Sequence, residues 1–123
     1  MSFDRYAVVR VPFPFTDRTA TKNRPAVVLS DPRTFNTPAG HSVMAMITSQ
    51  DNPPWPLDCT LADLAAAGLP APSRVRFKLF TLDHRLVRGE IGKLAPADAA
   101  LVDAGLTELL GGRRRDEEAR STS

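Results

Sequence analysis

Hydrophobic and polar positions alternate at the start of the chain and predict a strand over residues 6–15. Alternation with a period of two is the pattern of a strand whose successive side chains point to opposite faces of a sheet. Two prolines lie on the polar face, and proline cannot donate a hydrogen bond to a neighbouring strand. We therefore expect the end of this strand to be a sheet edge or a turning point. One face would hold Ala7, Val9, Val11, Phe13 and Phe15, and the other Tyr6, Val8, Arg10, Pro12 and Pro14.

Four further segments have the hydrophobic pattern of strands. Two are largely apolar, as in strands that are buried on both faces of a sheet. A third alternates, and the last contains two glycines, which suggest bends such as those at barrel corners. The four segments are residues 26–30 and 42–48 (apolar), 74–81 (alternating) and 86–94 (with Gly89 and Gly92); the polar residues 16–23 are predicted to form a loop.

Two helices are predicted, a short one in the middle of the chain and a longer one near its end. Residues 60–63 resemble a capping box with Asp63 in place of glutamate, ahead of a short run that Gly68 ends. Pro96 suits the first position of the second helix. Five or six short strands with one C-terminal helix indicate a mainly β protein with helices, built as a small, strongly bent β-barrel. The apolar stripe of the second helix would be Val102, Leu106, Leu109 and Leu110.

Length and composition set the class of protein. The 123 residues suit one domain, which we place at residues 1–110, followed by a charged tail at 111–123 that we expect to be disordered. The chain has neither an apolar run long enough to cross a bilayer nor a signal-peptide pattern at its start, so we expect a cytoplasmic protein without membrane contact. Cys59 is the only cysteine and the two histidines lie far from it, so we expect neither a disulfide, nor a metal site, nor a cofactor.

Arg24 and Thr48 are the candidate catalytic residues. Pro25 biases Arg24 towards an extended conformation just before a buried strand, so a permanent positive charge would be held at the mouth of that strand. A guanidinium in this position can bind phosphate oxygens with its planar fork, or it can make a surface ion pair. Thr48 ends the strand at 42–48 and would lie beside Arg24, although a hydroxyl there can also satisfy a backbone group.

A basic stripe is expected on the strand at 74–81. Arg74, Arg76 and Lys78 fall on one face of it, and their mutual repulsion is relieved either by a bound phosphate backbone or by acidic residues on a neighbouring strand. The net charge of +2 is weak evidence for a polyanionic partner. Trp55 lies among prolines and can either stack on a base or pack its loop onto the barrel. We expect His84, next to Asp83, to be structural.

The order of motifs resembles the MazF/PemK family, the toxins of bacterial toxin–antitoxin pairs, many of which are ribonucleases. The resemblance covers about residues 6 to 110 and depends on the ordered set of motifs, because no single motif is decisive. These are VVRVPFPF at 8–15 with Thr16-Asp17, KNRPAVVLS at 22–30, ITSQ at 47–50, KLFTLD at 78–83, and GKL at 92–94 followed by the terminal helix.

This resemblance implies an SH3-like barrel, shared by MazF, PemK and the gyrase poison CcdB, that forms a homodimer. It implies a groove for single-stranded RNA, a cognate antitoxin as partner, and contact with DNA only through the antitoxin complex. Arg24 and Thr48 match the family's catalytic arginine and threonine or serine. The expected reaction is metal-independent cleavage by the 2′-hydroxyl, giving a 2′,3′-cyclic phosphate and inhibiting translation and growth. Residues expected to contact RNA are Thr16, Lys22, Asn23, Ser49, Gln50, Arg74, Arg76 and Lys78.

The sequence departs from the family pattern at one chemically important place. Some relatives carry an aspartate shortly after an arginine in the strand at 74–81 and use it as the base, whereas this chain has Phe77 and Lys78 there. The general base is therefore unassigned. Two alternatives remain open: a growth inhibitor on the same barrel that acts on DNA gyrase without cutting RNA, as CcdB does, and a barrel that serves only as a binding module.

Overall fold

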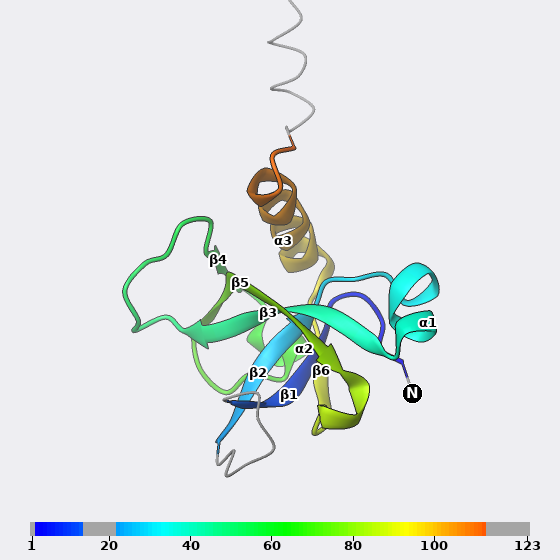
Figure 1. Ribbon diagram of the computed structural model, residues 1–123. Coiled ribbons are helices and arrows are strands. Elements are labelled where there is room, and N and C mark those ends of the chain that lie inside the picture. The colour runs from blue at the N-terminus through cyan, green and yellow to red at the C-terminus, as the bar shows by residue number, and fades with distance from the viewer. Residues whose placement is uncertain (1, 14–21, 113–123) are drawn as a thin grey trace, which may run out of the picture.

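The computed structural model describes residues 2–13 and 22–112, and these residues form a curled antiparallel sheet with a helix across one side (Figure 1). The strand order in the sheet is β4-β5-β3-β2-β1-β6. This is the mainly β architecture with a C-terminal helix that the sequence predicts, and that prediction is confirmed. The strands are β1 (Ala7–Phe13), β2 (Lys22–Val28), β3 (His41–Ser49), β4 (Cys59–Thr60), β5 (Ser73–Asp83) and β6 (Glu90–Lys93).

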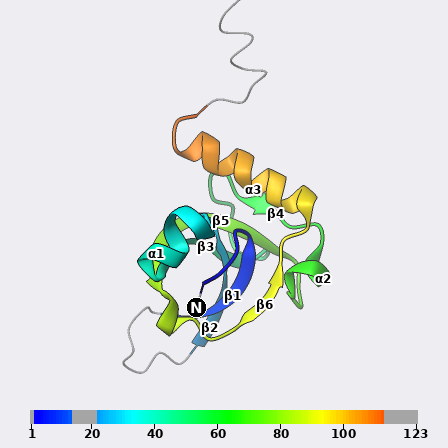
Figure 2. The same cartoon turned by 90° about the vertical axis from the view of Figure 1, so that its right-hand side faces the viewer.

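Helical segments cover parts of the sheet and connect its strands. Figure 2 shows α3 lying across the sheet and α2 beside β6. Pro96 stands at the start of α3, as expected, because the first turn of a helix has no use for its missing amide hydrogen. The segments are a π-helical turn (Pro32–Asn36), α1 (Thr37–Ala39), α2 (Leu64–Ala67), a 3₁₀ turn (His84–Leu86) and α3 (Pro96–Leu109).

Both faces of β1 are buried, so the prediction of one inner and one outer face is wrong. Val8 was assigned to the outer face, yet it is completely buried in a cluster with Val27, Val75 and Val102. Val102 belongs to α3, and this helix closes the face that the alternation pattern leaves to solvent. The other face of β1 packs into a second cluster, which contains Phe3, Ala7, Val9, Val11, Ala26, Val28, Met44 and Leu82.

Strand β2 begins at Lys22, four residues before the predicted start. Its first residues pair with the end of β1, where Val11 lies opposite Arg24 and Phe13 opposite Lys22. The pairing of β2 with β3 begins at Ala26, so Pro25, which has no amide hydrogen, leaves no hydrogen bond between these two strands unmade. Arg24 therefore stands within a strand and not in a loop before it.

Three other boundaries differ from the prediction. Thr60 does not cap α2, because it lies in β4 opposite Arg74; the cap is Asp63, whose carboxylate accepts a hydrogen bond of 2.9 Å from the Ala66 amide. The last strand starts only at Glu90, because a 3₁₀ turn occupies the start of the predicted segment. On α3, Leu109 and Leu110 are 39% and 73% exposed. Gly105 takes the inward position instead, against Phe77 and Cys59.

Strand β5 is irregular where it crosses the middle of β3. Ala45 lies opposite Leu79, but the next residue of β3, Met46, lies opposite Arg76. Phe77 and Lys78 are therefore extra residues on β5, in the manner of a β-bulge, and a bulge increases the local bend and twist of its strand. On either side of this irregularity, Arg76 and Lys78 line one depression together with Phe13 at the end of β1 and Arg24 near the start of β2.

Helix α2 approaches β6 so closely that only glycine fits between them. A Cβ atom at Gly92 would fall on the backbone carbonyl groups of Ala66 and Ala67, well inside van der Waals contact. Gly68 meets Ile91 in the same way and has φ +72°, a conformation that favours glycine.

We expect Gly92→Ala to lower the free energy of unfolding by about 1–3 kcal/mol, because the methyl group collides with backbone that cannot rotate away. Urea denaturation followed by circular dichroism measures the change. The matched control is Lys93→Ala at the next residue of the strand, where the exposed side chain should leave stability within about 0.5 kcal/mol. Equal stability of the two variants would contradict the tight approach.

Candidate functional site

A depression of about 280 Å³ opens where the ends of several strands meet. It brings together three cations from two strands, Arg24, Arg76 and Lys78, with the hydroxyl of Thr48. No carboxylate is among the described residues that line it. Such a lining favours an anionic ligand. The complete lining is Phe13, Arg24, Met46, Ile47, Thr48, Asn52, Arg76 and Lys78.

Strand register explains why residues so far apart in the sequence meet here. Arg24 shares a face of β2 with Ala26, which lies opposite Met46 on β3. Thr48 follows Met46 by two residues and so lies on the same face, and Arg76 lies opposite Met46. This is the face whose apolar residues form the cluster around Val9 and Val28. The same face of the sheet therefore carries buried apolar residues in one part and, further along the strands, the polar residues that line the depression.

Arg24 is exposed and its charge is not neutralised by a carboxylate among the described residues. The central carbon of its guanidinium lies 5.9 Å from the centre of the Phe13 ring, at the outer limit of a cation–π contact. The contact with the ring restricts the position of the guanidinium but does not occupy its N–H hydrogen-bond donors. Among the described residues, no hydrogen bond occupies the five N–H donors of Arg24, so this part of the chain leaves them to a ligand.

Thr48 is half-buried and its hydroxyl oxygen already has a partner. The side-chain amide of Asn52 donates a hydrogen bond to Thr48 Oγ1. With the oxygen engaged as an acceptor, the hydroxyl hydrogen is free to point into the depression. The sequence analysis did not include Asn52 among the candidate site residues, although Asn52 belongs to the polar run of residues 48–52 at the end of the strand.

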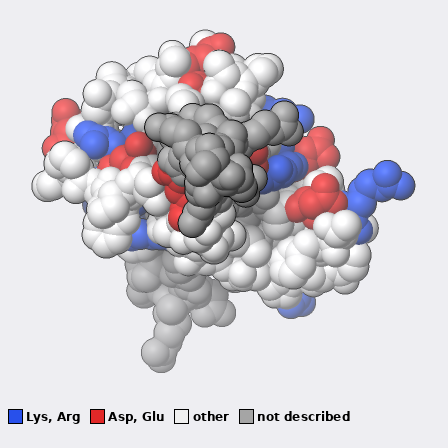
Figure 3. All heavy atoms as spheres, turned by 90° about the horizontal axis from the view of Figure 1, so that it is seen from above, with Lys and Arg blue, Asp and Glu red and all other residues white. Residues whose placement is uncertain are grey.

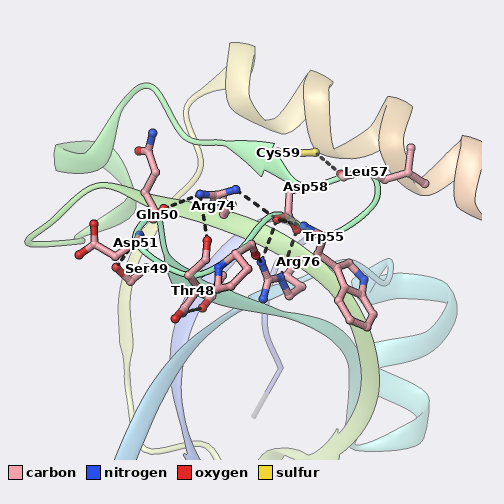
Figure 4. Close-up of polar contacts among 12 residues, drawn as sticks. Thr48, Ser49, Gln50, Asp51, Trp55, Leu57, Asp58, Cys59, Arg74 and Arg76 are labelled. Carbon is pink, nitrogen blue, oxygen red and sulfur yellow. Dashed lines mark hydrogen bonds and ion pairs between the residues drawn. The ribbon is translucent and has the colours of Figure 1, made fainter.

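Arg74 and Arg76 are held by Asp58, the residue just before β4 (Figure 4). Arg76 uses two nitrogens, with Nε 3.3 Å from Asp58 Oδ1 and Nη2 3.0 Å from Oδ2. Arg74 Nη1 lies 3.5 Å from the same Oδ2. The two arginine side chains are only 13% and 11% exposed. The sequence left two explanations for the basic stripe: a bound phosphate backbone, or acidic residues on a neighbouring strand. For Arg74 and Arg76 the second explanation holds, because Asp58, next to β4, provides the negative charge.

The same arginines fasten the loop between β3 and β4. Arg76 Nη2 donates to the Pro53 carbonyl at 2.7 Å, and Arg74 Nη2 donates to the carbonyls of Gln50 and Asn52. Burial alone would raise the pKa of Asp58, but the hydrogen bonds from Arg76 and the Trp55 amide, with the two positive charges, lower it below its usual value. Asp58 is therefore a fixed counter-charge and a poor proton acceptor.

Lys78 differs from the two arginines because its described partner is an aromatic ring. Its ammonium nitrogen lies 4.8 Å from the centre of the Trp55 ring, and the Arg76 guanidinium lies 5.7 Å from that centre. Trp55 remains 44% exposed. The loop is thus attached to β5 by Asp58, while its tryptophan stays at the surface next to the depression.

The other residues expected to contact RNA lie outside the lining of the depression. Asn23 accepts a hydrogen bond of 2.9 Å from Arg88, and Ser49 Oγ accepts one of 3.2 Å from the Asp51 amide. Gln50 is exposed, and its carbonyl binds Arg74. Lys22 is exposed two residues before Arg24, on the same face of β2. Thr16 and most of the predicted tail, residues 113–123, lie outside the described residues.

A larger depression, of about 400 Å³, lies around His41 and Asp83. Its charges are already paired, because Arg85 Nη2 lies 2.7 Å from Asp83 Oδ2 and lowers the pKa of that carboxyl. His84 is buried there and lies 2.7 Å from the buried hydroxyl of Ser42, which agrees with the structural role expected for it. Among the described residues that line this depression, no charge stands apart from a partner as Arg24 does in the other one.

Two kinds of site are missing from the part of the chain that the structure covers. Residues 2–13 and 22–112 contain no group of three or more histidine, cysteine, aspartate or glutamate side chains placed to hold a metal ion. Among the same residues, no helix has the length and apolar character needed to span a bilayer.

On the face above α3, Figure 3 shows acidic and basic side chains interspersed, unlike the depression with its three cations.

We expect Asp58→Asn to destabilise the fold by about 1.5–3 kcal/mol at pH 7, because two charged hydrogen-bond donors lose their counter-charge. Since folding lowers the pKa of Asp58, its stabilisation is present above the unfolded value of about 3.9 and is lost as the pH falls through the folded value. The difference in denaturation midpoint between wild type and variant should therefore be larger at pH 7 than at pH 3. The control, Asp103→Asn, breaks the exposed pair with Arg5 and should change little at either pH.

Comparison with known proteins agrees with this architecture. The family model described as "PemK-like, MazF-like toxin of type II toxin-antitoxin system" matches residues 4–110. No curated protein sequence matches. Among solved structures, MazF from Deinococcus radiodurans is similar with 25% identity and a TM-score of 0.68, over 90% of this chain and 98% of that one.

Two further structures share the fold. A MazE-MazF complex from the same organism has 23% identity and a TM-score of 0.71, over 92% of this chain and 100% of that one. An endoribonuclease in complex with its cognate antitoxin, from Mycobacterial species, has 17% identity and a TM-score of 0.71, over 92% and 97%. With the family model spanning nearly all of the described residues, the chain belongs to the family of PemK-like, MazF-like toxins of type II toxin-antitoxin systems.

Proposed function

We propose that this protein is an endoribonuclease that cleaves single-stranded RNA without a metal ion, and that Arg24 and Thr48 act on the scissile phosphate. The observation that carries this proposal is the depression, where Arg24 has no carboxylate partner among the described residues and lies with Thr48 and two further cations. Membership of the toxin family supports it. A related structure of the same fold is also described as an endoribonuclease.

The proposed reaction needs few groups from the protein. The 2′-oxygen forms a bond to phosphorus while the bond from phosphorus to the 5′-oxygen breaks, so a 2′,3′-cyclic phosphate and a 5′-hydroxyl are produced. Negative charge grows on the phosphoryl oxygens, and donors aimed at it lower the barrier. Arg24 donates through its planar fork and Thr48 through its hydroxyl hydrogen, while Asn52 keeps the Thr48 oxygen occupied.

Proton transfer is the step for which the depression offers no carboxylate. One group must accept the proton of the 2′-hydroxyl and another must protonate the leaving 5′-oxygen. Asp58 lies close by, but its lowered pKa and two arginine partners make it a poor base. The proposal therefore gives Arg24 the role of stabilising the transition state and assigns the general base to no residue.

The surroundings of the depression suggest how RNA would be held. Lys78 and Arg76 line the depression and would attract the phosphates on either side of the cut. Lys22 would extend this charge along β2, and the loop at 49–52 would contact bases. We retain Thr16, Asn23, Ser49, Gln50 and Arg74 as contacts of a longer RNA, with Arg74 acting through the loop that it fastens.

We also propose a cognate antitoxin and a second copy of the chain as partners, in the cytoplasm. One similar structure is described as a MazE-MazF complex and another as an endoribonuclease in complex with its cognate antitoxin, which supports the first partner. An antitoxin segment with acidic side chains would suit the cations of the depression and would compete with RNA for them. Two exposed leucines, Leu101 on α3 and Leu110 directly after it, at 54% and 73%, support association with another surface.

We expect Arg24→Ala to slow RNA cleavage by about 100- to 1000-fold in excess EDTA, because the transition state loses its main donor. Arg24→Lys should recover only part of the rate, since an ammonium group cannot bind two oxygens with a planar fork. Cleavage is followed on a long single-stranded RNA by mapping fragment ends. The matched control is Arg33→Ala, an exposed arginine outside the depression.

Wild-type protein that arrests growth while cellular RNA stays intact would overturn the nuclease proposal. Action on DNA gyrase would then be the function to test. Equal activity of Arg24→Ala and wild type would remove Arg24 from the site even if RNA is cut.

Thr48→Val keeps the size of the side chain and removes its hydroxyl. We expect cleavage to slow by about 10- to 1000-fold, with the thermal midpoint little changed, because the oxygen and its partner Asn52 both lie near solvent. Single-turnover rates measure the effect. Thr81→Val, at an exposed position farther along β5, is the control and should cleave at the wild-type rate.

A further inference from the structure

We propose that Trp55 is a stacking platform for one nucleobase of the RNA, next to the phosphate held in the depression. This inference rests on the proposed function and adds a base-binding site to it. Aromatic side chains bind single-stranded nucleic acids by stacking on the flat faces of bases, with additional attraction from nearby cations.

The position of the ring relates it directly to the depression. Arg76 and Lys78 line the depression, and both lie over the Trp55 ring, at 5.7 Å and 4.8 Å from its centre. A phosphate bound by these two cations would therefore lie within one nucleotide of a base on the ring. The indole is 44% exposed, so a large part of its surface is open to a ligand.

The loop presents the ring in a fixed way. Asp58 accepts a hydrogen bond of 3.0 Å from the Trp55 amide while it binds Arg76 at 3.0 Å (Figure 4). Arg76 also binds the Pro53 carbonyl at 2.7 Å, and Pro54 and Pro56 flank the tryptophan and restrict its backbone. Because the loop is ordered by these contacts, a base would bind without the cost of ordering it.

The same contacts argue against a purely structural role for the indole. The loop is already attached to β5 through Asp58, which binds both arginines. A tryptophan needed to fasten the loop would bury most of its ring, as large aromatic side chains do in cores and interfaces. Trp55 instead leaves 44% of its surface exposed, beside positive charge.

The test uses the fluorescence of Trp55, the only tryptophan of the chain. The probe is a random-sequence pool of 2′-O-methyl oligonucleotides of about 15 residues. It lacks the attacking hydroxyl, so binding is measured without cleavage. The control probe is an oligonucleotide of the same length and phosphate charge in which every base has been removed. We expect the first probe to quench the indole emission and the abasic chain to leave it nearly unchanged.

Binding of the variants then tests the stacking itself, and it is measured by the fluorescence anisotropy of a dye-labelled pool because Trp55→Ala and Trp55→Phe lack the indole. Trp55→Ala should bind the base-containing pool about 5- to 150-fold more weakly, whereas Trp55→Phe, which keeps an aromatic face, should recover most of the affinity. Phe35→Ala is the matched control, because Phe35 is an exposed aromatic residue on the π-helical turn and should not contribute. Thermal denaturation of each variant shows whether the fold is intact.

The outcomes separate this inference from the proposed nuclease function. If the wild type cuts RNA but its tryptophan is quenched equally by both probes, or if Trp55→Ala and Phe35→Ala bind equally well, the stacking platform is overturned and the nuclease stands. If the bases quench Trp55 while natural RNA stays uncut, the platform stands and the nuclease proposal falls.

Discussion

Burial of the central strands on both faces is the constraint on which the rest of this structure depends. Val27 and Val28 of β2, adjacent in sequence, belong to two different core clusters on opposite sides of the sheet. A sheet of six short strands can supply two cores only if it curls and if a helix closes its remaining face. The bulge in β5 and the position of α3 meet these two needs. The polar depression then lies where the strands continue past one of the cores.

Charge compensation divides the basic residues into two groups with different roles. Asp58 binds both Arg74 and Arg76, so its single negative charge offsets one of their two positive charges, and these contacts hold the loop between β3 and β4. Arg24 has no carboxylate among the described residues and lies at the depression itself. Arg74 and Arg76 therefore organise the loop, and Arg76 also lines the depression, whereas Arg24 is left to a ligand by the described residues. The difference comes from a single acidic residue outside the strands that carry the arginines.

Several residues of the depression could be recognised from the sequence, but the hydrogen bonds and ion pairs among them and their neighbours could not. Polar residues at the ends of apolar runs marked Arg24 and Thr48, because a buried strand that turns polar places its last side chains at a surface. Asn52 and Asp58 stand in a loop rich in proline, where no periodicity assigns a direction to any side chain. Their contacts with Thr48 and Arg76 follow from how that loop folds back on β5.

The sequence by itself determined the strand-rich class, most element positions and the family, because local alternation, prolines and glycines act on neighbouring residues. The sequence pattern placed Val8 and Pro12 on the solvent side of β1. Alternation identifies one buried face of a strand, but it does not show whether another element covers the opposite face. Only the tertiary structure decided that α3 closes this face, that Gly105 and not Leu109 packs inward, and that Asp58 binds Arg74 and Arg76. Each of these depends on contacts between residues far apart in the chain, for which the local pattern carries no information.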